Sequence, residues 1–208
     1  MQVSKWGNSL AVRLPAVVVE ALDLKEGDEI EIAIAGKRDF KVARDRSKER
    51  ALEQLRQMKW SFPLLISNSI AKRSMNDKPF FDTNVILYAF RQDDTRGQVA
   101  ETLLAAGGAL SVQVLNEFVG VARRKLDKSW EEVRRALDIL RVFCPEPVPL
   151  TVETHERAVH IAERYGYSIF DSLIIAAALH VGADTLYSED MRDGQAIDGL
   201  TIRNPFSR

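Results

Sequence analysis

The chain has 208 residues, of which 46% are hydrophobic and 28% are charged, with a formal net charge of −1. This composition is typical of a globular protein of one or two domains. The single cysteine, Cys144, excludes an internal disulfide and suits a small buried hydrophobe. The longest apolar run, 173–179, is far shorter than the roughly 20 residues that span a bilayer, so we expect a cytoplasmic protein that does not enter a membrane.

The charge is unevenly distributed along the chain. Residues 1–46 have a net charge of 0, residues 47–74 of +4, and residues 75–208 of −5. A basic segment between a neutral and an acidic region favours docking of that segment on the acidic region. The same charges also suit a solvated linker helix, and charge alone favours that second interpretation.

The first 46 residues predict a small β-rich unit. Apolar side chains alternate with small or polar ones in 9–14, 30–34 and 40–42, the period of half-buried strands. Pro15 suits the first position of a short helix that extends to Leu22. A unit of about 45 residues buries too little surface to be stable alone, so we expect it to dimerise.

Residues 47–74 predict a helix followed by a connector. The segment 47–60 places Leu52, Leu55 and Met58 on one helical stripe, with Trp60 just beyond it. Residues 61–75 show no periodicity, which indicates an extended connector.

From Lys78 onward, short strands alternate with helices. Strands are predicted at 80–81, 185–187 and 200–202, and Ala109–Leu110 is strand-like. Helices are predicted at 95–106, after a Ser111 cap, after a Ser129–Glu132 capping box, from Thr151 to Tyr165, and over the apolar segment 169–181. This alternation predicts an α/β domain with a mainly parallel sheet that helices cover on both faces.

Four acidic residues lie where such a sheet presents its ligands, at the carboxyl ends of strands: Asp82, Glu117, Asp171 and Asp190. Each has a structural alternative. Asp82 suits a helix cap, Asp171 matches a capping box with Ser168, and Asp190 suits a turn. A buried Glu117 is harder to explain, because glutamates are rarely buried without a partner.

The four carboxylates together predict a cation site. At close range, like charges repel by roughly 4 kcal/mol per pair at an effective dielectric near 20. A hard divalent cation relieves this repulsion, and an all-oxygen ligand set selects Mg²⁺ or Mn²⁺, ions that suit phosphodiester hydrolysis. The three histidines and one cysteine show no zinc-ligand spacing.

Four segments resemble, in order, the successive blocks of VapC-type PIN domains: FFDTNVILYAF, SVQVLNEFV, YSIFDSLIIAAAL and TLYSEDMRDGQAIDGLTIRNPF. This resemblance implies that residues 75–208 form a three-layer α/β domain with a parallel sheet. It also implies an Mg²⁺- or Mn²⁺-dependent endoribonuclease toxin with an RNA substrate. The metal-binding acids that it implies are the four named above. It adds Asn84 and Ser188 as supporting polar residues and Asp193 as a candidate outer acid.

Residues 1–46 resemble the AbrB/MazE-type domains of VapB antitoxins through KWGNSLAVRLP and LKEGDEIEI. This resemblance implies a swapped-hairpin β-rich dimer that binds operator DNA in the major groove. The matching polar positions are Lys5, Asn8, Ser9 and Arg13. Arg and Asn side chains read base edges, and Lys and Ser hold phosphates. The structural alternative is that Gly7–Asn8 forms only a hairpin turn.

The segment ALEQLRQMKWSFP resembles the toxin-binding helix and tail of a VapB antitoxin. The resemblance implies an inhibitory segment within 47–74 that uses Leu52, Leu55, Arg56, Met58, Lys59 and Trp60. It ends at Pro63, and Met75 resembles the start of a separate toxin. The sequence leaves open which basic residue, Arg56, Lys59 or Arg73, approaches the acidic site.

The sequence therefore predicts an inhibitory, DNA-binding antitoxin fused to its ribonuclease toxin, in a homo-oligomer. One alternative is a transcriptional autorepressor whose nuclease is permanently masked. Another is a PIN nuclease that cuts structured DNA, which the short body without visible insertions disfavours.

Overall fold

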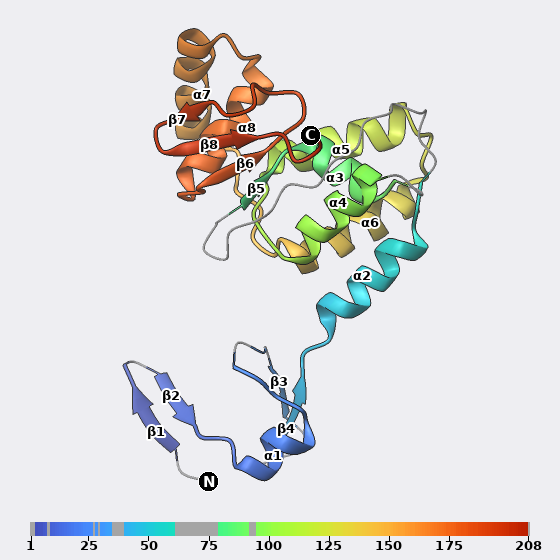
Figure 1. The fold of residues 1–208 in the computed structure, drawn as a ribbon, viewed down its shortest axis with the longest axis vertical. Helices are drawn as coiled ribbons and strands as arrows, with labels where there is room; N and C mark the ends of the chain where they lie inside the picture. Colours follow the sequence, from blue (N-terminus) through green and yellow to red (C-terminus); the bar gives the residue numbers. More distant parts are fainter. Residues whose placement is uncertain are drawn as a thin grey trace. The chain divides into compact units, whose positions relative to one another are not determined.

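The computed structural model describes residues 3–7, 9–26, 28, 30–34, 40–60, 79–91 and 95–207. The chain divides into two compact units, Met1–Ser47 and Lys48–Arg208, whose elements are labelled in Figure 1. In the described part of the chain, no helix combines the length and the apolar character that crossing a membrane requires.

The N-terminal unit consists of two antiparallel hairpins and one short helix. β1 (Val3–Trp6) pairs with β2 (Ser9–Val12) through a turn at Gly7, whose φ of 59° is left-handed and suits glycine. α1 (Ala16–Ala21) follows Pro15, and β3 (Ile30–Ile34) then pairs with β4 (Phe40–Arg44). The three strands and the helix expected from the sequence are present, but β2 ends at Val12 and not at Leu14, and β1 was not expected.

This unit shows no core of its own among the side chains that the structure describes in it. Ile32 of β3 is 60% exposed, and Ile30 and Val12 are also exposed. Apolar strand residues normally face another layer, so a second surface is needed to cover them. This exposure supports the expectation of a dimer.

The second unit contains a four-stranded sheet in the order β5-β6-β8-β7. β5 (Pro79–Phe81), β6 (Thr185–Tyr187) and β8 (Leu200–Arg203) run parallel, as expected. β7 (Ala196–Ile197) is antiparallel to β8, so the sheet is mainly parallel, as predicted, with one antiparallel strand at its edge. The reason is a two-residue turn, Asp198–Gly199, in which both residues have positive φ and return the chain directly into a hairpin.

Six helices surround this sheet in the described ranges: α3 (Thr83–Ala89), α4 (Thr95–Ala105), α5 (Val112–Arg124), α6 (Trp130–Phe143), α7 (Val152–Tyr165) and α8 (Ile169–His180). In Figure 1, α7 and α8 lie together beside β6, β7 and β8, whereas α3 to α6 lie next to β5. The predicted caps at Ser111, Ser129 and Thr151 are confirmed. Cys144 is buried, and this burial raises its pKa to about 12, as suits a small hydrophobe.

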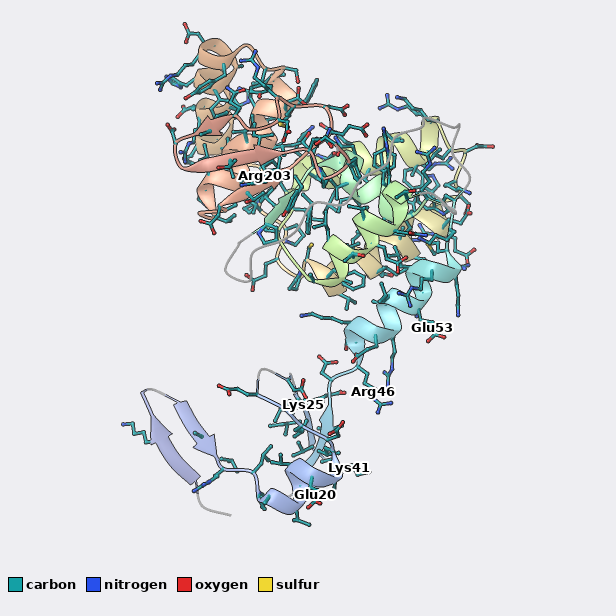
Figure 2. All side chains as sticks on the ribbon, in the orientation of Figure 1. Glu20, Lys25, Lys41, Arg46, Glu53 and Arg203 are labelled. Atoms are coloured by element: carbon teal, nitrogen blue, oxygen red, sulfur yellow. The ribbon has the colours of Figure 1, made fainter. Side chains whose placement is uncertain are left out.

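α2 (Ser47–Gln57) belongs almost entirely to the second unit. It buries Ala51 and Leu55 in the same hydrophobic core as the sheet, and Leu52 and Met58 pack against that core. Only Asp45 and Arg46 separate β4 from α2; Arg46 is labelled in Figure 2. The expected apolar stripe of this helix is therefore confirmed, with Ala51 added to it.

Candidate active site

Asp82 lies directly after β5 and forms the N-cap of α3. Its backbone N–H donates to the Tyr187 carbonyl on β6 (3.0 Å), which fixes the residue at the carboxyl edge of the sheet. Its Oδ1 accepts the backbone N–H of Thr83 (2.6 Å). The residue is 4% exposed. Burial, with smaller contributions from Glu117 and Asp190, raises the pKa of its carboxyl from 3.8 to about 7.

Glu117 approaches Asp82 from α5. Thr83 Oγ1 donates to Glu117 Oε2 (2.7 Å), so the residue after Asp82 holds one carboxylate oxygen. Gln113 Nε2, one helical turn earlier on α5, donates to the other oxygen (2.8 Å). The Glu117 carboxylate is thereby oriented from both α3 and α5.

Asp190 comes from the loop after β6. In that loop, the buried Ser188 donates its hydroxyl to Asp82 Oδ2 (2.6 Å) and accepts the backbone N–H of Asp190 (3.2 Å). Asn84 Nδ2 donates to Asp82 Oδ2 (2.9 Å) and to Asp190 Oδ2 (3.2 Å). Asp82, Glu117 and Asp190 therefore meet at one place, and we refer to these three residues as the carboxylate cluster.

Two further acids from the sequence analysis have other partners. Asp171 lies in the first turn of α8, where its Oδ2 accepts the Ser168 hydroxyl (2.8 Å) and its N–H donates to the Ser168 oxygen (3.1 Å). Asp193 Oδ1 accepts the backbone N–H of Asn204 (2.8 Å). Among the described residues, no hydrogen bond joins either acid to the carboxylate cluster.

The chemistry of the carboxylate cluster fits a hard divalent cation. Within the described ranges, no three His, Cys, Asp or Glu side chains are placed so that together they could hold a metal ion. Mg²⁺ needs no complete cage, because it commonly uses one or two carboxylates and keeps several waters. The Asn84 Oδ1 atom is buried without a hydrogen-bond partner, so it is a further candidate oxygen ligand for a cation beside Asp82 and Asp190.

Two family models match the chain. The PIN domain model matches residues 80–195, more than half of the chain. The chain belongs to the PIN domain family. A second model, described as "Antidote-toxin recognition MazE, bacterial antitoxin", matches residues 3–49. A MazE-type antitoxin domain and a PIN domain are thus fused in one chain. No curated protein matches the chain in sequence.

Solved structures show limited similarity. A toxin–antitoxin complex from Klebsiella pneumoniae is 22% identical with a TM-score of 0.49, covering 62% of this chain and 99% of that one. A sarcin–ricin loop cleaving VapC toxin from Mycobacterium tuberculosis is 20% identical with a TM-score of 0.44, covering 54% and 89%. A VapBC complex from Rickettsia felis, bound to a DNA fragment from its promoter, is 24% identical with a TM-score of 0.46, covering 61% and 97%. Similarity at this level carries no argument about activity.

Trp60, just beyond α2, packs on the PIN domain against aromatic residues of its core. Its ring stacks on Phe90 (centroids 5.0 Å apart) and on Phe118 (5.6 Å), the residue after Glu117. Its backbone N–H donates to the Phe90 carbonyl (2.6 Å), and the residue is 2% exposed. An aromatic side chain buried this fully contributes a large apolar contact area.

Arg56 and Lys59, two of the basic residues considered from the sequence, pair with a carboxylate outside the cluster. Arg56 Nε donates to Glu101 Oε1 (2.6 Å), and Lys59 Nζ donates to Glu101 Oε2 (3.1 Å). Both cations therefore bind the same carboxylate on α4. Arg73, the third residue considered from the sequence, lies outside the described residues.

In the N-terminal unit, Lys5 and Arg13 are exposed. The sequence places Arg13 within a strand, but β2 ends at Val12, so Arg13 follows the strand and does not belong to its face. The Asn8 position and the Ser9 side chain lie outside the described residues.

Sequence reasoning missed Thr83 and Gln113. Gln113 precedes Glu117 by four residues, a spacing that places both on one helix face and would have identified it. Thr83 lies between two named residues, but its contact with Glu117 spans 34 positions, and no local pattern indicates it.

Proposed function

We propose that residues 75–208 form an Mg²⁺- or Mn²⁺-dependent endoribonuclease and that residues 47–74 inhibit it within the same chain. In the same proposal, residues 1–46 bind operator DNA as a homodimer. The observation that carries the nuclease assignment is the carboxylate cluster at the ends of β5 and β6 in a PIN domain.

Some side chains at this site are proposed metal ligands, and others hold these ligands in position. Asp82, Glu117 and Asp190 are the proposed metal ligands, with Asp171 as the fourth acid that the resemblance implies. When bound, Mg²⁺ or Mn²⁺ supplies Lewis-acid activation of a water and of the phosphodiester. Ser188 and Asn84 hold Asp82 and Asp190 in position, and Thr83 and Gln113 hold Glu117. Fixed ligands of this kind lower the cost of reorganisation during reaction.

Inhibition is supported by the contacts of Trp60 and by the two bonds to Glu101. The Trp60 ring stacks on Phe118 of α5, the helix that also carries Glu117, and Arg56 and Lys59 hold the end of α2 on α4. Because the segment is covalently joined to its target, its effective concentration reaches the millimolar range for a short linker. Even a weak contact then keeps most molecules closed.

The test measures Mn²⁺-dependent cleavage of single-stranded RNA by the full chain and its variants. We expect the unmodified chain to be nearly inactive and Trp60→Ala to be at least tenfold faster. Trp60→Ala combined with Glu117→Gln should be inactive again, because the cluster has lost a ligand. Trp130→Ala is the matched control, since this tryptophan is 55% exposed and lies on α6.

Circular dichroism establishes that each variant is folded. Glu101→Gln weakens the same docking from the PIN side without removing a core residue, so it should also raise the cleavage rate. Cleavage by the unmodified chain as fast as by Trp60→Ala would refute inhibition. Cleavage by the Glu117→Gln combination at the Trp60→Ala rate would refute the site.

The burial of Trp60 also favours the second candidate, a transcriptional autorepressor whose nuclease is permanently masked. The two candidates differ in the response to Trp60→Ala. A folded variant that binds operator DNA but still cleaves no RNA would favour the autorepressor.

A further inference from the structure

Glu189 lies between two residues of the candidate site, Ser188 and Asp190, but its own side chain bonds elsewhere. Its carboxylate accepts a hydrogen bond from Arg96 Nη1 on α4. Arg96 Nη1 also donates to Tyr88 Oη on α3 (2.8 Å). Arg96 thus links Tyr88 and Glu189, and we call these three residues the Arg96 clamp.

The clamp is enclosed by aromatic rings. The Arg96 guanidinium lies 5.3 Å from the centre of the Tyr88 ring and 5.9 Å from that of Phe206. The two rings meet edge to face with their centres 4.9 Å apart. Arg96 is 7% exposed, so its charge is held almost out of water. Burial is the largest of the causes that raise the pKa of Tyr88 to about 12, and its hydroxyl keeps its proton.

The clamp connects the elements that carry the cluster. α3 begins directly after Asp82 and carries Asn84 and Tyr88, while the loop after β6 carries Ser188 and Asp190. Asp190 itself is exposed, and hydrogen bonds of Asn84 and Ser188 hold it. Asn84 joins this loop to α3, and the adjacent Glu189 joins it to Arg96 on α4.

A buried ion pair of this kind is weak evidence for stability. Removing two charges from water costs several kcal/mol per ion, so hydrophobic replacements of similar volume are often equally stable. What the planar guanidinium offers is geometry, because it donates in fixed directions.

We propose that Arg96 is a positioning residue that, through Glu189 and Tyr88, fixes the loop bearing Ser188 and Asp190 and so sets the affinity of the carboxylate cluster for a divalent cation. This proposal rests on the proposed metal-dependent function. It assigns Arg96 no contact with the cation or with RNA. Loosening the loop lets Asp190 move away from Asp82 and Glu117, which weakens cation binding while the fold persists.

The test titrates Mn²⁺ into the full-length protein and follows free Mn²⁺ by electron paramagnetic resonance. This readout needs no RNA cleavage and is independent of inhibition. We expect Arg96→Met to raise the Kd for Mn²⁺ at least tenfold. Arg96→Lys should recover only part of the affinity, because it keeps the charge but loses the fixed geometry. Arg135→Met is the matched control, since Arg135 pairs with Glu131 on the exposed surface of α6.

Thermal melting in EDTA distinguishes an effect of Arg96 on the position of the loop from an effect on the stability of the fold. Arg96→Met leaves Glu189 with an unpaired charge, so a lower melting temperature is expected. Arg96→Met combined with Glu189→Met removes both charges and should restore melting but not Mn²⁺ affinity. If affinity recovers together with melting in this double variant, or never falls in Arg96→Met, positioning is overturned.

The same Mn²⁺ titration also tests the metal site of the proposed function. If the unmodified chain binds no Mn²⁺, or if Glu117→Gln binds it unchanged, the metal site itself is wrong and the role of Arg96 falls with it. If the unmodified chain binds Mn²⁺ at the cluster and Arg96→Met binds it equally well, only the role of Arg96 is refuted.

Discussion

Asp82 is a buried carboxyl next to two other carboxylates, and this gives it a measurable linkage to pH. Its pKa is raised to about 7 in the folded protein, whereas an unfolded chain ionises it near 3.8. Between these values the folded state holds a proton that the unfolded state has lost. Stability therefore falls as pH rises from about 4 to 7, and the loss is complete above pH 7.

Replacing Asp82 by Asn removes this loss of stability at high pH. In EDTA at pH 8, we expect Asp82→Asn to be more stable than the unmodified chain by about 1–3 kcal/mol in urea unfolding. The difference should disappear toward pH 4. Asp138→Asn serves as a control, because Asp138 is exposed and its partner Arg141 is 3.6 Å away. At each pH, the quantity compared is the stability of Asp82→Asn minus that of the unmodified chain. A smaller difference at pH 8 than at pH 4 would contradict this linkage.

Arg13 is the residue of the N-terminal unit most open to a direct test. It is exposed and resembles an operator-binding position, so Arg13→Ala should weaken operator binding by about 1–3 kcal/mol and relax preference at one base pair. Gel-shift titrations at one salt concentration measure both effects. Lys41→Ala removes an equal charge from β4 as a control. Equal losses in the two variants would indicate charge alone and exclude Arg13 as a base contact.

For individual residues, the sequence predicted the members of the candidate site that follow the ends of strands. Asp82 and Asp190 meet because parallel strands end at one edge of the sheet, and Asn84 and Ser188 lie within two residues of them. Arg96 was not predicted. It is 93 positions away from Glu189, and only the folded arrangement of α4 against the loop brings the two together.

Among the elements, α6 begins with the clearest local signal. Ser129 Oγ accepts the Glu132 N–H (3.2 Å), and Glu132 Oε2 accepts the Ser129 N–H (2.7 Å). Two donors that the helix leaves unpaired are thereby satisfied. The bond from the Ser129 N–H is also the first cause of the lowered pKa of the Glu132 carboxyl.

Ser129→Ala should therefore destabilise the second unit by about 1 kcal/mol, measured as the change in free energy of unfolding in urea. Glu131→Ala, in the same turn, removes only an exposed ion pair with Arg135 and should change stability by less than about 0.5 kcal/mol. Equal effects of the two substitutions would show that the capping box contributes nothing beyond surface charge.

Element prediction succeeded where the signal is local. Caps at Ser111, Ser129 and Thr151 depend on a side chain and a backbone N–H three residues later, so the sequence contains the whole interaction. β7 was missed because it has only two residues, too few to show a period. The docking of α2 was indicated by its apolar stripe, but its anchor Glu101 lies on another element and had no sequence signal.

For the whole molecule, the exposed apolar side chains of β3 indicate how the chain associates. We expect the full-length protein to be at least a dimer in sedimentation experiments across a range of concentrations. Ile32→Lys should convert it to monomers and abolish operator binding, because it places a charge on a surface that needs covering. Val152→Lys, which alters an exposed valine on α7, should leave the assembly unchanged. A dimeric Ile32→Lys protein would place the association surface elsewhere.

The fusion of a MazE-type antitoxin domain and a PIN domain in one chain has a consequence for the stoichiometry of this system. When an inhibitor and its target are separate molecules, dilution or unequal synthesis leaves some targets uncovered. Here each polypeptide carries one copy of each, so the ratio is fixed at synthesis and does not depend on the amount of protein. Under the inhibition proposed above, release would come from local opening around Trp60 or from cutting of the chain. The first route is reversible on every molecule, whereas the second is permanent.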